Sequence, residues 1–104
     1  MQRTLIISAL LSGLLLAGAA SAATPNVDVR QANQRARINQ GVASGELTHR
    51  EAARLRAQQA HIRRDERVAK SDGVVTRRER ARLQNELNQA DRNIAQQKHD
   101  WQQR

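Results

Sequence analysis

The chain has 104 residues, a formal net charge of +8 at pH 7 and no cysteine. Without cysteine there is neither a disulfide nor a thiol for lipid attachment, which excludes a disulfide-stapled fold and a lipid-anchored cysteine. Phe and Tyr are absent and there is a single Trp, so the chain lacks the aromatic platforms on which proteins stack single-stranded nucleic acid. Its positive charge therefore indicates anionic partners other than nucleic acid.

Residues 1–23 are predicted to be a signal peptide. Arg3 supplies the positive charge near the start, Leu5–Leu16 an apolar run, and residues 20–23 the small side chains typical of a cleavage site. The run has about a dozen residues, whereas a membrane-spanning helix needs roughly 20. We therefore expect cleavage and export to the periplasm or the exterior, with an uncleaved N-terminal anchor as the alternative.

Residues 24–104 are predicted to form one small all-α domain. This part has 81 residues, with 17 Lys and Arg, 10 Asp and Glu, and only 13 Leu, Ile and Val. Large aliphatic residues thus fall below the roughly 20% at which disorder becomes a concern. We expect either a marginally stable monomer or a chain stabilised by a partner or by association into a homodimer.

The first helix is predicted over residues 28–43, capped by Asn26 or Asp28. Gly41 and Gly45 mark its expected end. Its expected buried stripe consists of apolar and small residues at helical spacing, with one Asn among them. These residues are Val29, Ala32, Ala36, Asn39 and Val42, with Ile38 beside them.

The second and third helices are predicted over residues 48–69 and 77–103, as an antiparallel hairpin with a short connection. The buried seam expected for the second helix is Ala52, Leu55, Gln59, Ile62, Glu66 and Ala69. Its two polar positions suggest a weak seam frayed by solvent, with a buried polar switch as the alternative. The seam expected for the third helix is Leu83, Leu87, Ala90, Ile94, Gln97 and Trp101. We expect Trp101 to be shielded if this seam extends to the end of the helix.

A basic edge runs beside the seam of the second helix. Four positive side chains recur there at helical spacing, so they share one side of the helix. They are Arg56, Arg63, Arg67 and Lys70. This edge is the predicted binding surface for acidic or unfolded proteins or for an anionic membrane surface, and a solvated surface without a specific partner is the alternative.

An eleven-residue stretch occurs twice, at Gly45–Leu55 and at Gly73–Leu83, with seven identical positions. Such a repeat indicates a duplicated helix-turn-helix. Each copy has a Thr followed three residues later by Glu, the pattern of a capping box at the start of a helix. The predicted caps are Thr48 with Glu51 and Thr76 with Glu79. Gly73 is expected in a left-handed conformation.

The second copy also resembles the back half of an EF-hand calcium loop. Taking Gly73 as the turn glycine places Asp72, Thr76 and Glu79 on ligand positions, which makes them candidate metal ligands. The first two acidic positions hold Val68 and Lys70 instead, and neither residue coordinates calcium. The first copy keeps only Thr48 and Glu51 of the side-chain ligands. These departures suggest a helix-loop-helix frame without calcium, and a plain capping box explains the same residues.

The two copies further resemble the LTxxQ motif of the small periplasmic Spy/CpxP-like family. The motif falls at Leu47–Glu51 and Val75–Glu79, with Glu in place of Gln in both copies. The resemblance implies an exported helical hairpin that dimerises into a cradle with a basic concave face. It also implies an ATP-independent chaperone or a modulator of envelope stress.

The remaining residues do not indicate a catalytic site or a metal site. His61 has Asp65 four positions later and His99 is next to Asp100, but no two His are spaced as metal ligands, which favours solvated surface histidines. No nucleophile with a neighbouring base and no acid pair in an apolar pocket is apparent. We predict a non-enzymatic, cofactor-free exported binding protein, chaperone-like or stress-related. The alternative is a degenerate EF-hand-like module that binds a divalent cation or a protein.

Overall fold

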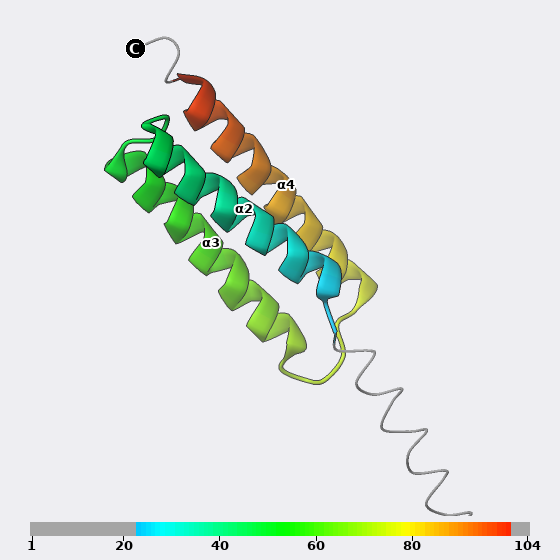
Figure 1. Cartoon of the computed structure of the whole chain (residues 1–104). Helices are drawn as coiled ribbons and strands as arrows, with labels where there is room; N and C mark the ends of the chain where they lie inside the picture. Colours follow the sequence, from blue (N-terminus) through cyan, green and yellow to red (C-terminus); the bar gives the residue numbers. More distant parts are fainter. Residues whose placement is uncertain (1–22, 101–104) are drawn as a thin grey trace, which may run out of the picture.

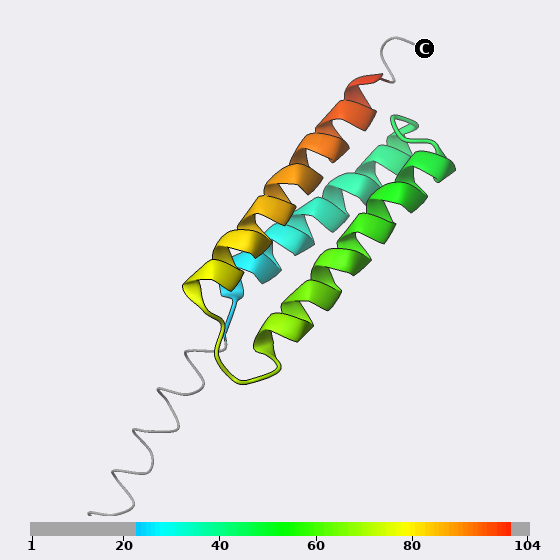
Figure 2. The same cartoon turned by 180° about the vertical axis from the view of Figure 1, so that it is seen from behind.

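The structure is a computed structural model and describes residues 23–100. Three helices follow one another in this range, namely α2 (Pro25–Ser44), α3 (His49–Lys70) and α4 (Arg77–Asp100). They lie side by side, with α3 antiparallel to both α2 and α4 (Figures 1 and 2). The all-α fold and the antiparallel hairpin are thus confirmed. Among these three helices, none has the length and apolar character needed to cross a bilayer.

Two predictions concern residues outside this range. Residues 1–22, which make up nearly all of the predicted signal peptide, are not among the described residues. Trp101, the expected last member of the α4 seam, also lies outside them. The signal peptide and the shielding of the indole therefore stay predictions.

Both connections between helices are built from the repeated stretch. Gly45 and Gly73 have φ angles of 81° and 84°, so the left-handed conformation predicted for Gly73 is confirmed. Leu47 and Val75 are the apolar residues directly before the two capping threonines, and both are buried, with 3% and 5% of their surface exposed. Each connection therefore reverses the chain at a glycine and anchors it to the core through one aliphatic side chain.

The capping boxes form at both predicted positions. Thr48 N donates to Glu51 Oε1 over 2.9 Å, and Glu51 N donates to Thr48 Oγ1 over 3.1 Å. The same two bonds join Thr76 and Glu79, again at 2.9 and 3.1 Å. At each helix start, two amide groups that lack a partner within the helix are thereby satisfied.

Helix α2 departs from its prediction at its start. It begins at Pro25 rather than at residue 28, because proline at the first helical position loses no hydrogen bond and already has a helical φ angle. Thr24 precedes it as the N-cap residue.

The expected buried stripe of α2 is wrong for most of its members, and only Ile38 and the partly buried Val42 pack in the core. Val29 is 59% exposed, and the buried face comprises Val27, Gln31, Gln34, Ile38 and Gly41. The face contains two amides because hydrogen-bond partners on α3 and α4 satisfy them. Such partners compensate for the burial of polar groups.

Of the two glycines expected near the end of α2, Gly45 is confirmed as its left-handed C-cap, whereas Gly41 lies within the helix. The helix continues through it to Ser44, and the side chain of Leu47 folds back against the glycine. A Cβ atom at position 41 would lie 2.7 Å from Leu47 Cδ1. The glycine is therefore needed for the close approach of the α2–α3 connection.

The seam of α3 is confirmed at all six positions. The expectation that its polar members are frayed by solvent is wrong, since Gln59 is 1% exposed and Glu66 is 7% exposed. Buried aliphatic side chains form two clusters, and the amide layer of Gln34 and Gln59 lies between them. One cluster comprises Val27, Ile62, Ala69, Val75, Leu83, Leu87 and Ala90. The other comprises Ile38, Leu47, Ala52, Leu55 and Ile94.

Candidate anion-binding groove

A cavity of about 200 Å³ lies between α2 and α3 on the side of the predicted basic edge. We call it the α2–α3 groove. Its lining contains three arginines, two amides and one aliphatic residue, and no carboxylate. The residues are Arg35, Ile38, Asn39, Arg56, Gln59 and Arg63. This composition suits a ligand with a negative charge and some apolar surface.

The three arginines of the groove differ in how they are engaged. Arg56 Nη2 donates to Asn39 Oδ1 over 3.1 Å, which connects α3 to α2 across the groove. Arg35 and Arg63 make no hydrogen bond and no ion pair with any residue between 23 and 100. Their guanidinium groups are therefore available to an anion, and arginine binds carboxylates in a fork with two parallel hydrogen bonds.

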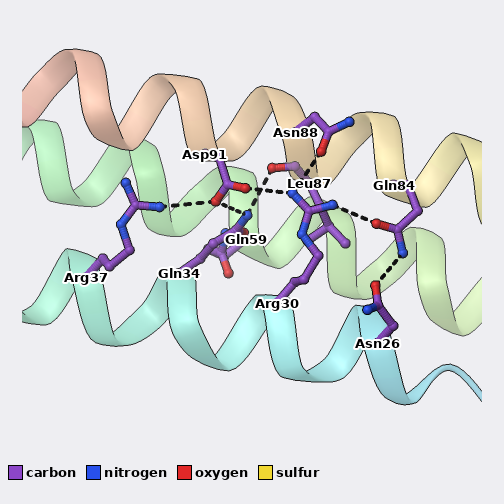
Figure 3. Close-up of polar contacts among 9 residues, drawn as sticks. All are labelled: Asn26, Arg30, Gln34, Arg37, Gln59, Gln84, Leu87, Asn88 and Asp91. Carbon is purple, nitrogen blue, oxygen red and sulfur yellow. Dashed lines mark hydrogen bonds and ion pairs between the residues drawn. The ribbon is translucent and has the colours of Figure 1, made fainter.

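A chain of amides fixes the inner wall of the groove (Figure 3). Gln34 Nε2 donates to Leu87 O over 2.9 Å and to Asp91 Oδ1 over 2.8 Å, both on α4. Because its nitrogen is held by two acceptors, Gln34 presents Oε1 to Gln59, whose Nε2 donates to it over 2.6 Å. Gln59 Oε1 is then left buried and receives no hydrogen bond from the described part of the chain.

Asp91 is itself held by arginines of α2. Arg30 Nη2 lies 2.6 Å from Asp91 Oδ2, and Arg37 Nη1 lies 3.2 Å from Oδ1 (Figure 3). Burial acts to raise the pKa of Asp91, but the hydrogen bonds from Arg30 and Gln34 and the charges of both arginines outweigh it and lower the pKa. The carboxylate is therefore ionised and keeps Gln34 in place.

The predicted basic edge is divided between two environments. Arg56 and Arg63 line the groove, whereas Arg67 is exposed and does not. Lys70 Nζ lies 3.4 Å from Glu66 Oε2. Arg35 was not predicted from the sequence, because only the orientation of α2 that places Gln34 in the core brings this arginine to the groove.

Lys70 belongs to a separate polar cluster around Glu66. The Glu66 carboxylate accepts hydrogen bonds from Thr24 Oγ1 and, over 3.0 Å, from Gln31 Nε2. The hydrogen bond with Glu66 raises the pKa of Asp28. Burial acts to raise the pKa of Glu66, but its hydrogen bonds with Asp28, Thr24 and Gln31 outweigh this and lower it. This cluster compensates for a buried acid where α2 begins.

The candidate metal ligands of the second connection lie in helix-start and turn geometry. Thr76 and Glu79 engage each other in the capping box, and Asp72 Oδ1 accepts a hydrogen bond from Val74 N over 3.2 Å. Each side chain thus has a partner in the backbone of the connection. The structure assigns these residues a local structural role, as it does Thr48 and Glu51.

The chain was also compared with known proteins. Neither the family models nor the curated proteins and solved structures that were searched contain a match to it.

Proposed function

We propose that the protein is a non-enzymatic, exported helical protein that binds acidic segments of unfolded or partner proteins through the α2–α3 groove. The supporting observation is that Arg35 and Arg63 face the groove with no anionic partner among residues 23–100. A chaperone-like or envelope-stress role is consistent with this binding and with the resemblance to the LTxxQ family.

Three features of the groove favour an acidic peptide over a bare inorganic anion. The arginines come from both helices, so successive carboxylates along an extended segment could each be bound. Ile38, of which 1% is exposed, adds an apolar floor below them. Gln59 Oε1 lacks a donor, and a peptide N–H group is a suitable donor for it once the side chains around the groove adjust.

The proposal is tested with a fluorescent peptide rich in Glu and Asp, whose binding is followed by anisotropy. Arg35→Gln, Arg56→Gln and Arg63→Gln combined should weaken binding at least about tenfold, or about 1.4 kcal/mol. Raising the salt concentration from about 0.1 M to about 1 M shortens the Debye length from about 10 Å to about 3 Å, so binding should fall steeply.

A matched control removes the same charge elsewhere. Arg50, Arg77 and Arg78 are exposed and unpaired within the described range, and they lie near the starts of α3 and α4. Replacing these three by Gln should leave peptide affinity within about threefold of the wild type, because only screened, long-range attraction is lost. Equal losses in the two triple variants would reject the groove. Preferential binding to anionic lipid vesicles over the peptide would reject a protein ligand.

A further inference from the structure

A cluster of three potential metal ligands lies between α3 and α4, apart from the α2–α3 groove. His61 and Asp65 come from successive turns of α3, and Glu86 comes from α4. One ligand atom from each side chain lies within 4.8 Å of the other two. His61 Nε2 and Asp65 Oδ2 are 3.2 Å apart. The first two residues are four positions apart in the sequence, whereas only the packing of α4 brings Glu86 near them.

Two carboxyl oxygens of this cluster are withdrawn from water. Asp65 Oδ2 and Glu86 Oε2 each expose less than 1 Å² and receive no hydrogen bond from the described residues, although the imidazole nitrogen of His61 lies 3.2 Å from Asp65 Oδ2. Two neighbouring carboxyl oxygens withdrawn from water repel each other unless a proton or a cation lies between them.

We propose that His61, Asp65 and Glu86 bind a divalent first-row transition-metal ion such as Zn²⁺. An imidazole and carboxylates are usual ligands of this ion, and its bonds to nitrogen and oxygen are about 2.0–2.2 Å long. Ligand atoms around it are therefore about 3.5 Å apart, so small side-chain rotations would close the present cluster.

The chemistry of the cluster disfavours calcium and magnesium. Calcium takes six to eight oxygen ligands, and magnesium retains most of its own water. Here only two carboxyl groups are offered, and the positive charges of Arg64 and Arg82 act on Asp65. These arginines weaken the binding of a hard cation, which is held by charge alone. They have less effect on a transition-metal ion, because this ion also forms a bond with the imidazole.

Isothermal titration of the purified protein with Zn²⁺ tests the proposal. We expect one ion per chain, and His61→Ala and Glu86→Gln should each weaken binding by about tenfold or more. His49→Ala and His99→Ala are matched controls, because both histidines are exposed and neither belongs to the cluster. Binding that survives Glu86→Gln, or that is lost in either control, would overturn the proposal.

A second measurement does not depend on how the variants fold. In NMR spectra of the wild-type protein, Zn²⁺ should shift the ring signals of His61 and leave those of His49 and His99 in place. Equal shifts of all three rings would mean unspecific binding and overturn the site. Glu79→Gln should leave the affinity for Zn²⁺ unchanged. If this substitution abolishes Zn²⁺ binding, the ion binds in the α3–α4 connection instead. Peptide binding in the α2–α3 groove is measured separately, so the two proposals fail independently.

Discussion

Gln34 of α2 donates a hydrogen bond from Nε2 to Oδ1 of Asp91 on α4 over 2.8 Å, and this bond sets the orientation of the buried amides (Figure 3). Gln34 in turn orients Gln59 of α3. One polar layer thus links all three helices and forms the inner wall of the α2–α3 groove.

Removing Gln34 should therefore cost more stability than its size suggests. Gln34→Ala removes three hydrogen bonds and leaves the buried Gln59 Nε2 without its acceptor, and the unpartnered amide alone costs about 1–3 kcal/mol. We expect the free energy of unfolding, measured with urea, to fall by about 3 kcal/mol. Asn33→Ala, at an exposed neighbouring position whose side chain makes no hydrogen bond with residues 23–100, should change it by less than about 0.5 kcal/mol. Equal effects of the two substitutions would contradict the role of the amide layer.

The ionisation of Asp91 should make the stability of the fold depend on pH. Its pKa is lowered in the folded protein below the ordinary value of 3.8, so the folded state binds the proton less readily than the unfolded state. The stabilisation is therefore present above pH 3.8 and is lost as the pH falls through the lower folded value. Asp91→Asn should lower the melting temperature at pH 6, and the difference from the wild type should shrink towards pH 2. A difference independent of pH would show that ionisation of Asp91 does not contribute.

The capping boxes should contribute similarly to the two connections. Thr48→Ala and Thr76→Ala each remove the acceptor of one amide hydrogen bond, so each should cost about 1 kcal/mol. Thermal unfolding followed by circular dichroism measures this. If neither substitution has an effect, the repeated stretch does not stabilise the helix starts.

Gly41→Ala should destabilise the protein although alanine is the better helix former by about 1 kcal/mol. The added Cβ would lie 2.7 Å from Leu47 Cδ1 and 2.8 Å from Leu47 Cγ, within a buried contact. Overpacking of this kind typically costs about 1–3 kcal/mol, so we expect a lower melting temperature. A higher melting temperature would mean that the α2–α3 connection does not pack as closely as the structure shows.

Buried positions could be predicted from the sequence where the buried residues are mostly apolar. The seam of α3 was predicted correctly because four of its six members are apolar and recur at helical spacing. The face of α2 was predicted wrongly because Gln31 and Gln34 are buried by partners on other helices, and local spacing contains no sign of those partners. The α2–α3 groove and the candidate metal cluster could not be predicted completely for the same reason. Arg35 and Glu86 join their clusters only through the packing of α2 and α4.

The most direct test of binding in the α2–α3 groove is an NMR titration of the protein with the acidic peptide, observing the arginine Nε–H groups and the glutamine side-chain amides. We predict that the largest and earliest shifts belong to Arg35, Arg56, Arg63 and the amide of Gln59. Shifts spread evenly over all exposed arginines, or concentrated at Arg77 and Arg78, would contradict a specific groove.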